Sequence, residues 1–132
     1  MSTVRYIVDD VTAAVGFYTQ HLGFRVVMHP APQFAMLVRD DLRLNLVSPV
    51  TVDQPGGGSR PMADGTVQRP GGWNRFALEV EDLDAVVQSL RSAGARFRNE
   101  IVECRGGRQI LVEDPSGNPV ELFQPTRSEA RL

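Results

Sequence analysis

The chain has 132 residues, of which 42% are hydrophobic, and a formal net charge of −2 at pH 7. This length suits one domain with a sizeable core, and the slight negative charge gives no reason to expect a nucleic acid or an anionic membrane as a partner. No apolar run approaches the roughly 20 residues that a membrane helix needs, and no secretory signal is evident. The single cysteine, Cys104, cannot form an internal disulfide, so a protein of the bacterial cytoplasm is expected.

The first half of the chain predicts a strand, a helix and three more strands. Apolar and polar residues alternate over residues 4–8, as in a half-buried strand. The pair Asp9-Asp10 then precedes an apolar stripe at helical spacing and can accept hydrogen bonds from the first helical turn, while Gly23 suits a helix end. Strands are expected at residues 24–28, 34–38 and 42–47, with turns at 29–32 and 39–41.

A stretch rich in glycine and proline, residues 49–72, follows the first half. A loop this long is unusual inside a compact domain. Two interpretations stay open, a flexible linker and a loop that covers a pocket. The run Gly56-Gly57-Gly58 is not a phosphate-binding loop, because neither a Lys-Ser/Thr pair nor a helix follows it.

The second half repeats the order of the first at an offset of 72 residues: residues 8–15 read VDDVTAAV and residues 80–87 read VEDLDAVV. A strand at 76–80 is expected to lead into a helix that begins near Asp82 and ends near Gly94. Strands are expected at 96–103, 109–113 and 119–123, with a type I turn at residues 114–117. Each half is therefore an α+β unit whose sheet has one face covered by a helix and one face that needs a partner.

Three runs of sequence carry a family resemblance: VDDVTAAVGFYTQHLGFRVV, WNRFALEVEDLDAVVQSLRSAGARF and LVEDPSGNPVELFQP. They resemble segments of the vicinal oxygen chelate (VOC) superfamily, which includes glyoxalases, bleomycin resistance proteins and ring-cleaving dioxygenases. The resemblance covers most of residues 3–125 outside the central loop. It implies a single VOC domain over residues 1–132, in which two βαβββ modules (3–48 and 73–125) form a U-shaped mixed sheet around a ligand cup. It also implies a homodimer.

Family members that bind a divalent metal place a ligand near the start of the first strand and another on the last strand of each module. The resemblance puts these four positions on Thr3, Asn45, Arg75 and Glu121. Only Glu121 is a usual metal ligand, and Arg75 is a permanent cation with no lone pair to give. The two histidines, His21 and His29, are expected to be structural or solvent-exposed. No metal and no other cofactor is therefore expected.

In place of a metal, the guanidinium of Arg75 is predicted to pair with Glu121 across neighbouring strands, an arrangement that can be bidentate. Strand alternation should line the cup with polar and aromatic side chains, namely Thr3, Arg5, Arg43, Asn45, Arg75, Glu79, Glu121 and Phe123. Trp73 is expected either to stack on a planar ligand at the mouth of the cup or to anchor packing. The alternative for the pair of Arg75 and Glu121 is an ion pair that fills a vestigial site without binding anything.

Two classes of function remain open. The first is a metal-free protein of the bleomycin-resistance type that binds a small organic molecule. The second is an enzyme, a lyase, isomerase or dioxygenase. It would be either metal-dependent or metal-free, with Glu121 as general base and Arg75 as stabiliser of an enolate oxygen. The missing histidine ligands favour binding slightly, and the sequence does not identify the ligand.

Overall fold

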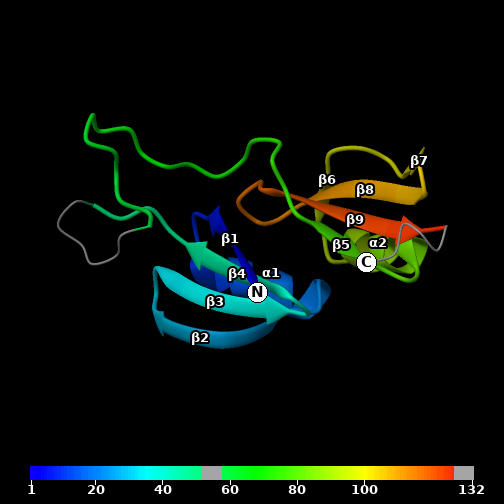
Figure 1. The fold of residues 1–132 in the computed structure, drawn as a ribbon, viewed down its shortest axis with the longest axis horizontal. Helices are drawn as coiled ribbons and strands as arrows, with labels where there is room; N and C mark the ends of the chain where they lie inside the picture. Colours follow the sequence, from blue (N-terminus) through cyan, green and yellow to red (C-terminus); the bar gives the residue numbers. More distant parts are fainter. Residues whose placement is uncertain (52–57, 127–132) are drawn as a thin grey trace. The chain divides into compact units, whose positions relative to one another are not determined.

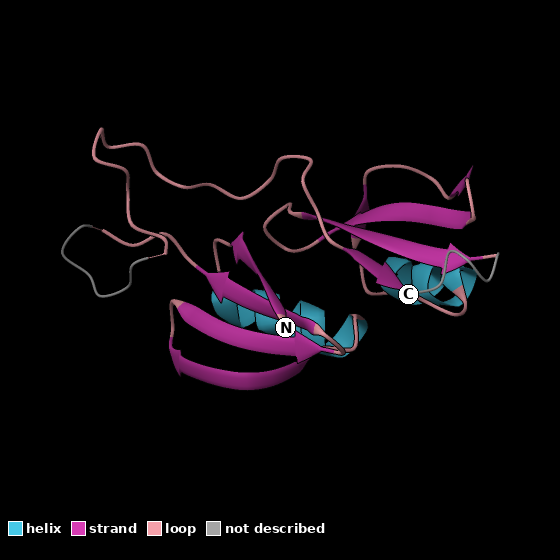
Figure 2. Cartoon of the chain, in the orientation of Figure 1, coloured by secondary structure: helices cyan, strands magenta, loops and turns pink. Residues whose placement is uncertain are grey.

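The computed structural model describes residues 1–51 and 58–126, so Gly56 and Gly57 of the glycine run lie outside the described residues. The chain divides into two compact units, Met1–Gly71 and Gly72–Leu132, which we call module one and module two. Each module holds one helix against one sheet (Figures 1 and 2), which confirms the expected α+β class and the repeated element order. Neither helix of the described residues has the length and apolar character needed to cross a membrane.

Module one consists of β1 (Ser2–Ile7), α1 (Val11–His21), β2 (Arg25–Ala31), β3 (Phe34–Arg39) and β4 (Leu42–Val47). Its sheet has the order β1-β4-β3-β2, with β1 parallel to β4 and the other pairs antiparallel. The side chain of Asp10 accepts a hydrogen bond from the N–H of Ala13, as expected of a helix cap. The core between α1 and the sheet contains fully buried side chains, among them Val11, Ala14, Tyr18, Leu37, Leu44 and Leu46.

The turn expected at residues 29–32 was placed wrongly. His29, Pro30 and Ala31 belong to β2, and Ala31 pairs with Phe34 across a tighter turn. Pro30 has no backbone N–H to donate. It is tolerated because β2 is an edge strand, which has a hydrogen-bonded neighbour on one side only. A register irregularity between Met28 and Ala31 accommodates the proline.

Module two consists of β5 (Ala77–Glu79), α2 (Leu83–Ser92), β6 (Arg96–Phe97), β7 (Val102–Cys104), β8 (Gly107–Glu113) and β9 (Pro119–Pro125). Its sheet has the order β5-β9-β8-β6, with β7 also paired to β8 and β5 parallel to β9. The side chain of Asp82 caps α2 by accepting the N–H of Ala85. Beyond the helix, Gly94 adopts a φ of 82°, a left-handed value that glycine takes at little cost.

The single strand expected at residues 96–103 is broken into β6 and β7. Between them the side chain of Asn99 accepts the N–H of Leu111 at 2.9 Å, in the place of a backbone carbonyl. The backbone N–H of Arg98 still donates to the carbonyl of Leu111 at 2.9 Å, so the chain leaves the ladder only for residues 99–101, and β8 keeps its hydrogen bond through Asn99. β8 begins at Gly107, two residues before the strand expected at residues 109–113.

The two modules use the same pairing at their parallel strands, and this pairing positions the candidate site. Arg5 lies opposite Asn45 in module one, and Ala77 lies opposite Glu121 in module two. Asn45 and Glu121 are thus equivalent positions on the last strands, as the family resemblance implies. Of the central loop, the described residues up to Gly71 belong to module one, and the N–H of Val50 donates to the carbonyl of Ser59.

Candidate functional site

The carboxylate of Glu121 lies on the face of the module-two sheet turned away from α2. Its strand neighbour Leu122 is fully buried on the helix side, so alternation directs Glu121 to the opposite face. The Nε and Nη2 atoms of Arg75 donate to Oε1 of Glu121 at 3.1 and 3.0 Å. The predicted contact is therefore present, but both donors converge on one oxygen instead of taking one oxygen each. The two side chains are 30% and 20% exposed.

Gln109, on β8, completes the surroundings of this carboxylate. With its amide nitrogen turned toward Glu121, it donates to Oε2 at 2.8 Å and to Oε1 at 3.1 Å; this orientation is assigned from the hydrogen bonds it satisfies. Sequence reasoning missed Gln109. The β8–β9 hairpin could have revealed it. The turn at residues 114–118 sets Leu111 opposite Glu121, and Gln109, two residues before Leu111, therefore lies on the same face of the sheet as Glu121.

Trp73 lies at the end of this face, just before β5. Its carbonyl oxygen accepts a hydrogen bond from Nη1 of Arg75 at 3.3 Å. The residue is 68% exposed, which is inconsistent with a buried packing anchor. The guanidinium carbon of Arg98 lies 4.5 Å from the ring centre, a cation–π contact that the sequence did not predict.

Glu79 and Phe123 lie opposite each other on β5 and β9, on the same face as Glu121. Both are half-buried. The ring of Phe123 lies against Gly107, which has no side chain to displace it. We refer to the side chains of this surface together as the Glu121 face: Trp73, Arg75, Glu79, Gln109, Glu121 and Phe123.

The predicted site residues of module one form two neighbouring pairs on β1 and β4. Thr3 lies opposite Arg43, and Arg5 lies opposite Asn45. Asn45 is only 8% exposed, and its Oδ1 atom has no hydrogen-bond partner among the described residues. The guanidinium of Arg5 lies against the backbone of Gly58, where a larger residue would collide with it.

The four family metal positions do not fit a divalent metal ion. In module two, the permanently positive guanidinium of Arg75 lies within hydrogen-bond distance of the Glu121 carboxylate, where it would repel a metal cation. In module one, Asn45 offers one neutral oxygen and Thr3 a hydroxyl, both weak ligands. Among residues 1–51 and 58–126, no three His, Cys, Asp or Glu side chains gather as a metal site would require.

The histidines take ordinary positions. His21 ends α1 and makes an edge contact with the ring of Phe17, with the ring centres 5.9 Å apart. His29 is exposed on the edge strand β2.

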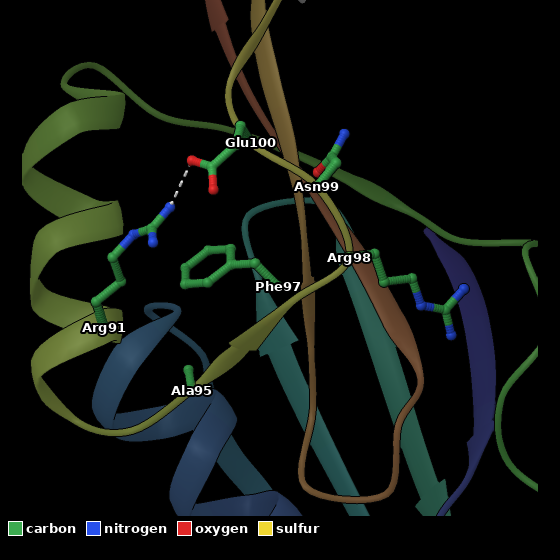
Figure 3. A pocket seen from close by; sticks show the side chains of 6 residues that line it. All are labelled: Arg91, Ala95, Phe97, Arg98, Asn99 and Glu100. Atoms are coloured by element: carbon green, nitrogen blue, oxygen red, sulfur yellow. Dashed lines mark hydrogen bonds and ion pairs between the residues drawn. The ribbon is translucent and has the colours of Figure 1, made fainter.

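A separate hollow of about 490 Å³ opens between the end of α2 and the segment that follows β6 (Figure 3). Its lining residues are Arg91, Ala95, Phe97, Arg98, Asn99 and Glu100. Arg91 pairs with Glu100 at 3.1 Å across this hollow and lies over the ring of Phe97, whereas the side chain of Arg98 points away from it (Figure 3). Phe97 pairs with Val112 on the helix side of the sheet, so this hollow is distinct from the Glu121 face.

Comparison with known proteins shows similarity along nearly the whole chain. The family described as the Glyoxalase/Bleomycin resistance protein/Dioxygenase superfamily matches residues 1–122. The bleomycin resistance protein of Geobacillus stearothermophilus is 28% identical over 127 residues, which cover 92% of this chain and 93% of that protein.

Two solved structures share the fold. A superfamily member from Sphaerobacter thermophilus superposes with a TM-score of 0.70 at 25% identity, covering 94% of this chain and 95% of its own. The Streptomyces protein TnmS3, an antibiotic binding protein, gives a TM-score of 0.69 at 24% identity, with 94% and 93% coverage.

Proposed function

Because the chain belongs to the glyoxalase/bleomycin resistance protein/dioxygenase superfamily, we propose that it is a metal-free protein that binds a small organic molecule at the Glu121 face. One observation carries the proposal: the positive guanidinium of Arg75 donates two hydrogen bonds to Glu121, the one usual metal ligand among the four family positions. The similarity to bleomycin resistance proteins supports binding as the activity.

Arg75 can hold a ligand and Glu121 at the same time. A guanidinium has five N–H donors, and the contacts to Glu121 and to the Trp73 carbonyl use three of them. The remaining donors, on a side chain that is 30% exposed, can reach a carboxylate, phosphate or carbonyl oxygen of a bound molecule. Glu121, itself held by Gln109, and the Trp73 carbonyl keep the guanidinium in place, so little side-chain entropy is lost when the ligand binds.

The enzyme alternative is less well supported. A general base must present a lone pair to the proton that it removes. Arg75 and Gln109 already donate to both oxygens of Glu121, which leaves one lone pair, on Oε2, for a substrate proton. We therefore assign Glu121 the task of orienting Arg75, and we assign Arg75 the contact with the ligand.

Metal content and ligand binding test this proposal together. Elemental analysis of the purified protein should find far less than one zinc, nickel, manganese or iron per chain. Bleomycin, and a library of small aromatic acids and amines, should be screened by calorimetry. A compound that binds should lose affinity in both Arg75→Ala and Glu121→Gln.

The control is Arg91→Ala, which removes an arginine–glutamate pair of the same module away from the Glu121 face. This variant should bind as the unmodified protein does. Stoichiometric metal that disappears in Glu121→Gln would refute the proposal and favour a metal enzyme.

The assembly that goes with this proposal is a homodimer. Light scattering coupled to size exclusion should then give twice the chain mass of 14.6 kDa. A mass of one chain at all concentrations would contradict this part of the proposal.

A further inference from the structure

Trp73 is an exposed aromatic side chain that is nevertheless held in place. The guanidinium of Arg98 lies under one face of its ring, with the guanidinium carbon 4.5 Å from the ring centre. Arg98 is itself fixed, because Nε donates to Glu113 at 2.9 Å, Nη1 to the carbonyl of Gly72 at 2.5 Å and Nη2 to the carbonyl of Gly117 at 2.8 Å. Its side chain is only 15% exposed.

From this geometry we infer that the ligand of the Glu121 face contains a flat, uncharged aromatic ring that stacks on the face of Trp73 opposite Arg98. The inference rests on the proposed function and adds a chemical class to it. A ring whose plane is set before binding loses little freedom when a second ring covers it, so the contact favours aromatic ligands.

The charge of Arg98 bears on which ring binds. One face of the indole already holds a cation, so a second cation on the open face would be repelled through the ring. Part of the repulsion is offset by Glu113, which is paired with Arg98. A neutral aromatic ring incurs no such cost, and it is the group that this platform favours.

A second contact defines the rest of the ligand. The carbonyl oxygen of Trp73 accepts a hydrogen bond from Nη1 of Arg75, so the residue that carries the ring lies next to the Arg75 anchor. A molecule with a flat ring and an acceptor oxygen beside it can contact both. The class of ligand is therefore an aromatic compound that carries a carboxylate or a similar oxygen group.

Two acids that differ only in flatness test the inference: 2-naphthoate and decahydro-2-naphthoate carry the same charge on the same ring skeleton. Trp73 is the only tryptophan of the chain, so protein labelled with 5-fluorotryptophan gives one ¹⁹F resonance. We expect 2-naphthoate to shift this resonance in a saturable manner and to bind about tenfold more tightly than the saturated acid.

Variants separate stacking from general structure. Trp73→Leu should bind both acids equally, whereas Trp73→Phe should retain part of the preference. Arg98→Lys cannot make the three hydrogen bonds, so it should reduce the preference for the flat acid. The matched control is Arg91→Lys, because Arg91 also lies over an aromatic ring of this module, that of Phe97, but in the separate hollow.

The outcomes distinguish this inference from the proposed function. Equal affinity for the two acids, lost in Arg75→Ala, overturns the stacking inference and leaves the binding site at Arg75. A preference for 2-naphthoate that survives Arg75→Ala and Glu121→Gln supports stacking and overturns the anchor. If neither acid shifts the resonance while another small molecule binds through Arg75, the stacking inference alone is refuted.

Discussion

Arg75 places two N–H groups on one oxygen of Glu121, at 3.1 and 3.0 Å. The second oxygen accepts the amide nitrogen of Gln109 at 2.8 Å. The carboxylate is thus held between the segment before β5 and the hairpin strand β8. This arrangement fixes the direction of the Arg75 side chain. A substitution of Arg75 should therefore affect ligand binding and the stability of the fold to different extents.

Removal of Arg75 should weaken binding far more than it weakens the fold. The pair is partly exposed, and such ion pairs contribute no more than about 1 kcal/mol to stability. Arg75→Ala should therefore change the free energy of unfolding by less than about 1 kcal/mol while ligand affinity falls at least about tenfold. Urea denaturation and calorimetry measure the two quantities. A loss of several kcal/mol would mean that the pair is mainly structural.

Replacement of Asn45 by an apolar residue should stabilise the protein. Its buried Oδ1 atom has no partner among the described residues, and an unsatisfied buried oxygen costs about 1–3 kcal/mol. Asn45→Leu, of similar shape, should raise the free energy of unfolding by about 1 kcal/mol. Asn45→Asp, which buries a charge instead, is the matched comparison and should destabilise the protein. If Asn45→Leu also lowers the free energy of unfolding, the amide of Asn45 stabilises the ligand-free protein, and the prediction is wrong.

Two glycines should respond in opposite directions to substitution by alanine. A Cβ atom at Gly107 would collide with the backbone oxygen of Gln124 and lie 2.9 Å from the ring of Phe123. Gly107→Ala should therefore cost about 1–3 kcal/mol. At Gly16, inside α1, nothing lies within 4 Å of the added atom, so Gly16→Ala should gain about 0.5–1 kcal/mol. Thermal and urea unfolding of both variants check the signs.

The pair of Asp84 and Arg108 should make stability depend on pH at the acid end. Hydrogen bonds from Nη1 and Nη2 of Arg108, at 3.0 and 3.1 Å, and its charge hold the pKa of Asp84 below its ordinary value of 3.8. A carboxyl whose pKa is lowered by folding stabilises the protein above its unfolded pKa, and the effect is lost as the pH falls through the folded pKa.

The stability difference between the unmodified protein and Asp84→Asn should accordingly be constant near neutral pH and narrow below pH 3.8. In Arg108→Gln, an NMR titration should show the pKa of Asp84 moving up toward its ordinary value. An unchanged titration in that variant would show that another group causes the shift.

Local chemistry was enough to predict most of the secondary structure. Asp10 and Asp82 cap the two helices because a carboxylate before an apolar stripe satisfies free N–H groups, and that reasoning needs no tertiary structure. The break between β6 and β7 was missed because it depends on the side chain of Asn99 reaching Leu111, twelve residues away.

The candidate site was predictable only in part. Arg75 and Glu121 could be paired because the family resemblance placed both at metal-ligand positions of the second half. Gln109 and Arg98 could not be placed in the same way. The position of Gln109 depends on the register of the β8–β9 hairpin, and that of Arg98 on the point just after β6 where the chain begins to leave the sheet. The roles of Thr3, Arg5 and Arg43 in binding stay predictions.

The repeated pairing of Arg5 with Asn45 and of Ala77 with Glu121 has an evolutionary consequence. Duplication of an ancestral half-gene produces such a pattern, and it supplies each functional position in two copies. One copy can carry an amide while the other keeps an acidic group, so the two halves can specialise separately. New specificity in a protein of this kind can be acquired one half at a time while the other half preserves an existing activity.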